Sequence, residues 1–148
     1  MNLKDKINLD LKDAMKSGDK IRLSVVRSIR ALILEFEKSG AAKELTPEDE
    51  LKMLTTAAKK RKDSIEQFRN AGRTDLADTE EAELKILMDY LPKQMDEEEI
   101  KNEIIRLANE IGAKSKADFP KLMPLVMKEL KGKADGKIVK SIVENILV

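Results

Sequence analysis

Apolar residues recur at intervals of three and four positions along most of the chain, a spacing that places them on one face of successive α-helices. The opening segment shows the pattern clearly, because Leu3, Ile7, Leu11 and Met15 are separated by lysine and aspartate residues. No segment of useful length alternates apolar and polar residues with the period of two that a half-buried β-strand requires. The pattern therefore predicts an all-α fold.

The first two helices are expected to meet at Gly18, because glycine readily ends a helix that begins near Leu3. The second helix is expected to bury an apolar stripe made of Val26, Ile29, Ile33 and Phe36. The stretch GAAKEL after Ser39 has the composition of a connecting loop. Together these features predict two antiparallel helices.

Thr46 and Pro47 predict the start of a third helix, because a threonine hydroxyl can cap free backbone N–H groups and proline already has a helical φ. Gly72 is expected to end this helix, and Thr74 or Asp75 is expected to cap a fourth. The seam of the third helix is apolar apart from one arginine and consists of Leu51, Leu54, Ala58, Arg61, Ile65 and Phe68.

Pro92, in the segment LPKQM, cannot continue the fourth helix and marks the expected domain boundary. We predict a four-helix N-terminal domain, residues 1–92, and a small three-helix C-terminal domain, residues 93–148. The second is near the lower size limit for independent folding. Asp96 is expected to start the first of its helices and Gly112 to end it. Asp118 and Pro120 are expected to start the second and Gly132 to end it, and Asp135 is expected to start the third.

The chain contains neither cysteine nor histidine. Disulfides, cysteine nucleophiles, Cys/His zinc sites and the commonest general base are therefore excluded. The glycine motifs that bind nucleotide phosphates and the nucleophile elbow are also missing from the sequence. Acidic runs at 48–50, 80–83 and 96–99 lie at expected helix starts, where the helix dipole favours negative charge. We assign no catalytic residue, no metal ligand and no cofactor.

Basic residues gather in two places, although the formal net charge is only +1. In the third expected helix, Lys59 and Arg61 belong to the block at 59–62. Because Arg61 lies on the apolar seam, its alkyl stem is expected to pack while its guanidinium reaches solvent or a carboxylate. Between residues 119 and 141, six lysines accompany only two acidic residues, which predicts a basic patch.

The four aromatic residues are Phe36, Phe68, Tyr90 and Phe119, and the phenylalanines are expected in the core. This argues against stacking on unpaired bases and favours lysine contacts with the phosphates of a structured duplex. A solvated surface is the alternative. The loop KGKADGK also has two interpretations: it is the end of one helix followed by the start of the next, or it is an anion-binding site. The candidate nucleic-acid-binding residues are Lys59, Arg61, Lys128, Lys131, Lys133, Lys137 and Lys140.

Three long stretches resemble the YqeY family: KKRKDSIEQFRNAGRTDLADTEEAELKIL, YLPKQMDEEEI and MPLVMKELKGKADGKIVKSIVENIL. The last is also similar to the helical tail of GatB, a subunit of glutamine-dependent tRNA amidotransferase, and to an appendage of some glutaminyl-tRNA synthetases. The resemblance implies a helical N-terminal domain joined to a tRNA-contacting module. The catalytic part of GatB has no counterpart in residues 1–92. The lysines in the matching segment are Lys128, Lys131, Lys133 and Lys137.

Three functions are compatible with these features. The first is a noncatalytic accessory protein that contacts tRNA, or a complex of tRNA with an aminoacyl-tRNA synthetase or amidotransferase. The second is a helical module that docks on a protein partner. The third is participation in carbon–nitrogen ligation with glutamine as amido donor. The opening segment lacks the apolar run of a signal peptide or membrane span, which predicts a cytoplasmic protein without a membrane partner.

Overall fold

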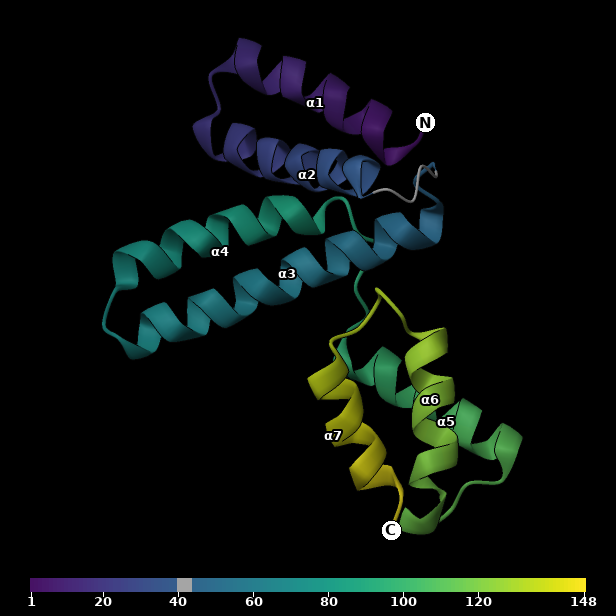
Figure 1. Cartoon of the computed structure of the whole chain (residues 1–148). Coiled ribbons are helices and arrows are strands. Elements are labelled where there is room, and N and C mark those ends of the chain that lie inside the picture. Colours follow the sequence, from purple (N-terminus) through teal and green to yellow (C-terminus); the bar gives the residue numbers. More distant parts are fainter. Residues whose placement is uncertain (40–43) are drawn as a thin grey trace. The chain divides into compact units, whose positions relative to one another are not determined.

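The computed structural model describes residues 1–39 and 44–148, so residues 40–43 of the expected GAAKEL loop lie outside it. The described residues form seven α-helices and a short 3₁₀ helix, and they contain no β-strand, which confirms the all-α fold (Figure 1). The helices are α1 (Leu3–Ser17), α2 (Lys20–Lys38), α3 (Pro47–Asn70), α4 (Thr74–Met88), α5 (Glu97–Ile111), η1 (Lys116–Asp118), α6 (Phe119–Glu129) and α7 (Gly136–Ile146).

Contacts between residues divide the chain into two compact units, Met1–Leu91 and Pro92–Val148. We call them the N-terminal unit and the C-terminal unit. Each unit encloses a separate cluster of buried apolar side chains. None of the described helices is long and apolar enough to cross a bilayer.

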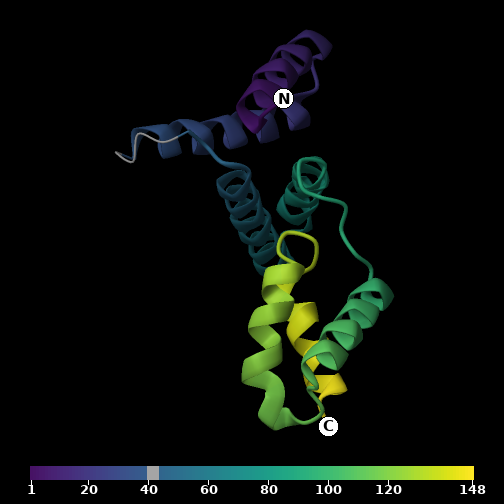
Figure 2. The ribbon, with the colours of Figure 1, turned by 90° about the vertical axis from the view of Figure 1, so that its right-hand side faces the viewer.

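Two antiparallel helix pairs build the N-terminal unit. Helix α1 packs along α2, helix α3 packs along α4, and α2 also contacts α4. Figure 2 shows the first pair crossing the second. The core between them consists of Leu3, Ile7, Val25, Val26, Ile29, Ile33, Leu54, Ala58 and Leu87. It follows the expected apolar stripes except that Val25 was not expected in it, and Met15 of the first stripe is 61% exposed.

Most helix ends in the N-terminal unit follow the expected capping chemistry. Gly18 has a φ of 73°, which only glycine adopts at low cost, and it ends α1. Thr46 caps α3 by accepting a hydrogen bond from the backbone N–H of Asp49 at 3.1 Å. The prediction for α4 is wrong, because Thr74 is already its first helical residue and Arg73 occupies the capping position. The Asp75 carboxylate instead accepts hydrogen bonds from the Arg73 guanidinium.

The C-terminal unit is a three-helix bundle in which α5, α6 and α7 all contact one another. Its core consists of Ile100, Ile104, Leu107, Ala108, Leu122, Val126, Leu130, Val139, Val143 and Leu147. Asp96 and Asp135 accept backbone hydrogen bonds at the starts of α5 and α7, as expected. The short η1 helix before α6 was not anticipated by the sequence pattern.

Candidate functional site

The candidate lysines of the C-terminal unit are exposed, but they are distributed over two helices and a loop. Lys137 and Lys140 lie one turn apart near the start of α7, on the same flank of the helix, with Val139 buried between them in sequence. Among the described residues, neither ammonium group forms an ion pair. These two lysines therefore offer two neighbouring positive charges.

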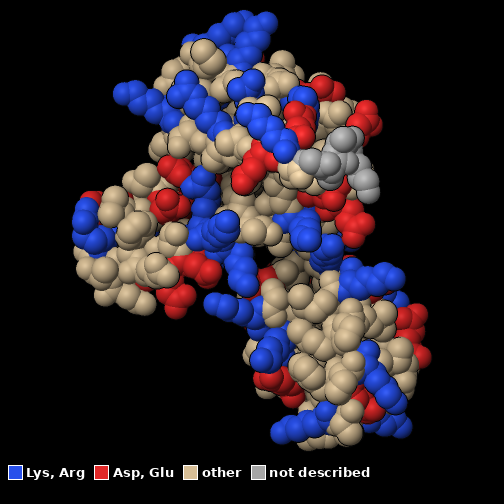
Figure 3. Space-filling model, viewed as in Figure 1, with Lys and Arg blue, Asp and Glu red and all other residues tan. Residues whose placement is uncertain are grey.

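Lys128 lies in the last turn of α6, on a different flank from the contact between α6 and α7. The side chain of Met127 faces α7, because its Cε atom is 3.5 Å from the position that a Cβ atom would take at Gly136. Lys128 follows Met127 and is turned about 100° further around α6. In Figure 3, the basic side chains on the visible face of this unit are separated by neutral and acidic ones.

Lys133 is close to the acidic helix α5. The pKa of Glu103 is lowered, first by hydrogen bonds from Arg106 and to a smaller extent by the positive charges of Arg106 and Lys133. Lys133 therefore contributes to the local electrostatics of α5. Lys133 is less available than Lys137 for an external anion, because its positive charge already interacts with the carboxylate of Glu103.

The loop between α6 and α7 is held by the segment that precedes α5. Gln94 Nε2 donates to the carbonyl oxygen of Gly132 at 2.7 Å, and the Met95 N–H donates to the carbonyl oxygen of Lys133 at 2.8 Å. Asp135 accepts a hydrogen bond from the Lys137 N–H at 2.9 Å. The start of α7 is thus capped by a carboxylate from the chain itself, as the helix-end interpretation of KGKADGK expects.

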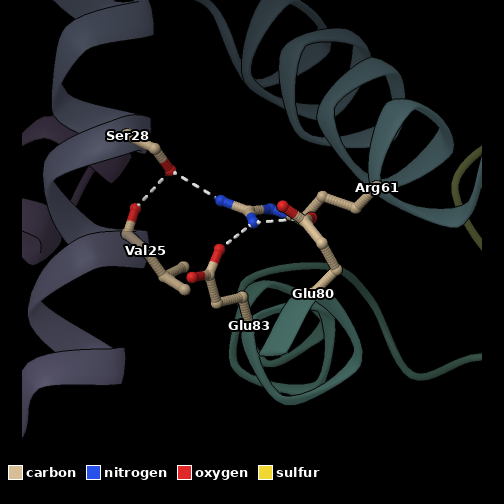
Figure 4. A network of polar contacts seen from close by, with 5 residues as sticks. All are labelled: Val25, Ser28, Arg61, Glu80 and Glu83. Carbon is tan, nitrogen blue, oxygen red and sulfur yellow. Dashed lines mark hydrogen bonds and ion pairs between the residues drawn. The ribbon is translucent and has the colours of Figure 1, made fainter. Parts of the chain in front are cut away.

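In the N-terminal unit, Arg61 lies between three helices (Figure 4). Its guanidinium donates hydrogen bonds to Glu80 at 3.3 Å and to Glu83, and a third to the hydroxyl of Ser28 at 3.3 Å. The Ser28 hydroxyl in turn donates to the carbonyl oxygen of Val25 at 2.7 Å. The side chain of Arg61 is 15% exposed. Its guanidinium therefore binds carboxylates rather than reaching solvent, whereas Lys59 on the same helix is exposed. Both carboxylates come from the middle of α4, so the expectation that the acidic run 80–83 lies at a helix start is wrong.

A groove of about 610 Å³ opens beside Arg61, between α2 and α3. Leu32 and Phe36 of α2 form one wall, and Met53 and Ala57 of α3 belong to the other. All four side chains are half-buried. The expectation that Phe36 lies in the core is therefore wrong. The four-residue spacing of Leu32 and Phe36 was the sequence signal for a second apolar stripe next to the core stripe.

Two lysines stand at this groove. Lys52 and Lys60 of α3 belong to its lining and are exposed. Figure 3 shows basic and acidic side chains beside one another on the visible face of this unit. No cluster of three acidic residues that could hold a metal ion occurs in the described parts of the chain.

The match to a known family covers the chain almost from end to end. The model of the Yqey-like protein family matches residues 4–147. A protein of Pyrenophora tritici-repentis named "Altered inheritance of mitochondria protein 41, mitochondrial" is 33% identical over 146 residues, which are 96% of this chain and 79% of that protein. An uncharacterized protein of Schizosaccharomyces pombe is 38% identical over 94 residues, covering 62% of this chain and 74% of its own length.

A second protein with the mitochondrial inheritance name, from Clavispora lusitaniae, is 36% identical over 110 residues, covering 72% of this chain and 63% of its own length. These names assign those relatives to mitochondria and mention no ligand or reaction. The family match confirms the resemblance found in the three sequence stretches. The chain belongs to the Yqey-like protein family.

Proposed function

We propose that this chain is a noncatalytic accessory protein whose C-terminal unit contacts the phosphate backbone of structured RNA, with tRNA as the ligand. The observation that carries the proposal is the pair of exposed lysines on one flank of α7, Lys137 and Lys140, neither of which forms an ion pair within the described residues. Two ammonium groups one helical turn apart can contact phosphates without reading bases.

The distribution of aromatic side chains supports backbone contact over base stacking. Phe119 packs against the C-terminal core, and Phe36 lines the groove of the N-terminal unit. Tyr90 donates its hydroxyl hydrogen to Asp10. Shape and charge are then the features by which the protein recognises the RNA duplex. Lys128, Lys131 and Lys133 would add contacts beside the α7 pair.

The contribution of the N-terminal unit to RNA binding is expected to be small. Arg61 already serves two carboxylates of its own chain, so contact with a phosphate would leave them uncompensated. Lys59 remains a candidate contact because it is exposed. An aminoacyl-tRNA synthetase or an amidotransferase would be a natural neighbour in a shared tRNA complex. We place this activity in the cytoplasm, and the names of the relatives make mitochondria the alternative.

The test is a titration of labelled tRNA with the full chain at low salt, comparing Lys137→Glu/Lys140→Glu with a matched control. Lys12→Glu/Lys16→Glu makes the same change in net charge at two exposed lysines of α1. We expect the α7 variant to lose about tenfold in affinity and the control to lose much less. Glutamate near the start of α7 suits the helix dipole, so the fold should persist.

Two results would contradict the proposal. One is the absence of tRNA binding by the unmodified chain at low salt. The other is an equal loss of affinity in both variants, which would indicate nonspecific attraction by the total charge. Far-ultraviolet circular dichroism of both variants checks that the helices are intact.

Docking of a protein partner is a second candidate function. The groove between α2 and α3 favours it, because half-buried apolar side chains in a concave surface are typical of peptide-binding sites.

A further inference from the structure

The apolar surfaces of α2 and α3 continue from the buried core of the N-terminal unit into the groove, and Met53 and Ala57 pack against the core as well as lining the groove. Leu32 directly precedes the buried Ile33, and Met53 directly precedes the buried Leu54. Ala57 likewise directly precedes the buried Ala58. Each helix therefore presents a core stripe and, beside it, a second stripe that lines the groove.

The groove has the dimensions of a helix-binding site. Its α3 wall extends from Asp49 to Ser64. At 1.5 Å per residue this wall is about 22 Å long, which corresponds to about four turns of a docked helix. On the opposite wall, Ser28, Leu32 and Phe36 follow one another at intervals of one turn. Two rows of side chains in turn-by-turn register can accept the ridge of a third helix between them.

Most charged groups in the groove are already satisfied by the chain. Asp49 accepts hydrogen bonds from the backbone N–H and the hydroxyl of Thr46, at 3.1 and 2.8 Å. Glu80 and Arg61 are paired at 3.3 Å. These groups hold the N-terminal unit together and leave little charge to offer a ligand.

Lys52 and Lys60 are different. Within the described residues neither ammonium group has a carboxylate partner, and both side chains are exposed. They are eight residues apart on α3, which is about 12 Å along the helix axis. The uncompensated charge of the groove is therefore positive, at two points about two helical turns apart.

We propose that this groove binds an amphipathic helix of a partner protein, with acidic residues at the edge of the helix. Its apolar residues, spaced as i, i+3 or i+4, and i+7, contact Leu32, Phe36 and Met53. Its acidic residues, two turns apart, pair with Lys52 and Lys60. The apolar walls suit side chains rather than a phosphate backbone. The site is independent of the α7 lysines, since it lies on other helices and takes another class of ligand.

The test uses the full chain and two labelled helical peptides of about 15 residues with the same leucine stripe. One peptide carries glutamates at the two edge positions, and the other carries lysines there. We expect the acidic peptide to bind at least about tenfold more tightly than the basic one. Amide chemical shift changes should concentrate on Leu32, Phe36 and Met53.

Charge reversal provides the sharper test. Lys52→Glu/Lys60→Glu should invert the preference, so that the basic peptide binds more tightly than the acidic one. Lys137→Glu/Lys140→Glu changes the net charge equally and should leave peptide affinity unchanged. Leu32→Ala should weaken both peptides while keeping the order of preference, since it shortens one wall of the groove without touching the lysines.

Several outcomes would overturn the proposal. Equal binding of the two peptides, no binding of the acidic peptide, or shift changes outside the groove would each do so. Self-association that is lost in Lys52→Glu/Lys60→Glu would identify a second copy as the occupant. A loss of tRNA affinity in that variant as large as in the α7 variant would identify the groove as an RNA surface. Failure of the RNA proposal leaves these expectations unchanged.

Discussion

Arg61 of α3 and Glu83 of α4 form an ion pair in which each side chain is only 15% exposed. The same guanidinium also serves Glu80, so a single positive charge compensates two carboxylates. Through Ser28 it reaches α2 as well. One arginine on an otherwise apolar seam therefore connects three helices of the N-terminal unit, which explains why this position is occupied by a long cation.

Replacing Arg61 by alanine should destabilise the N-terminal unit by about 2 to 3 kcal/mol, because two partly buried carboxylates lose their common partner. Arg69→Ala is the matched control, since Arg69 also pairs with two carboxylates of α4 but is 43% exposed. Its expected cost is below about 1 kcal/mol. Urea unfolding followed by circular dichroism measures both. Equal costs would show that the buried position of Arg61 is unimportant.

Tyr90 should titrate at an unusually high pH in the folded chain. Burial, and next the hydrogen bond to Asp10, raise the pKa of Tyr90 above the ordinary value of 10.0. Since the folded pKa lies above the unfolded one, the stability from this contact is complete below about pH 10 and is lost as the pH rises further. Tyr90 is the only tyrosine, and the chain has no tryptophan. Phenolate absorbance of folded and urea-unfolded protein therefore reports this one group.

Coincident titration curves for the folded and unfolded chains would contradict the assigned contact. Tyr90→Phe removes the hydroxyl that joins the segment after α4 to α1. We expect this variant to lose about 1 kcal/mol of stability at neutral pH. Because phenylalanine cannot ionise, its stability should also fall less steeply than that of the unmodified chain above about pH 10.

Asp118 should make the C-terminal unit sensitive to acid. Hydrogen bonds from the backbone N–H groups of Lys114, at 2.9 Å, and of Ser115, at 3.2 Å, lower the pKa of Asp118 below its ordinary value of 3.8. Its contribution to stability is thus present above that ordinary value and is lost as the pH falls through the lower folded value.

A carboxyl titration by NMR measures this effect directly, with the urea-unfolded chain as reference. The Asp118 midpoint should lie at lower pH in the folded chain. Asp118→Asn should reduce the acid sensitivity of the turn before α6. A folded midpoint at or above the unfolded one would show that the two backbone N–H groups do not hold the carboxylate in solution.

Local capping chemistry made much of the fold predictable. Thr46 and Gly18 mark helix ends through interactions with backbone groups a few residues away, so both partners of each interaction lie within one short stretch of sequence. The expected cap at Thr74 or Asp75 is wrong because threonine also tolerates the first helical turn, and the preceding Arg73 occupies the capping position without a side-chain hydrogen bond. Which of two adjacent residues begins a helix depends on the conformation of the turn that connects it to the previous helix.

The features that concern binding were harder to predict, because they depend on distant pairs. The position of Arg61 on the seam was evident, but its partners Glu80 and Ser28 are 19 and 33 residues away. Phe36 follows the core spacing of α2, and only the arrangement of α2 beside α3 turns it toward a groove. The excess of lysine after residue 119, and its distribution over two helices and the loop between them, follow from the expected helix ends. The structure moves Lys131 from the expected helix into the loop, because α6 already ends at Glu129.

Contact of Lys137 and Lys140 with RNA phosphates is the basis of the proposed function. The most direct measurement is the affinity of the full chain for tRNA over a series of salt concentrations, with Lys137→Glu/Lys140→Glu in parallel. We expect the logarithm of the affinity to fall linearly with the logarithm of the salt concentration, with a slope smaller by about two units in the variant. An affinity insensitive to salt, or the same slope for both proteins, would contradict the proposed contact.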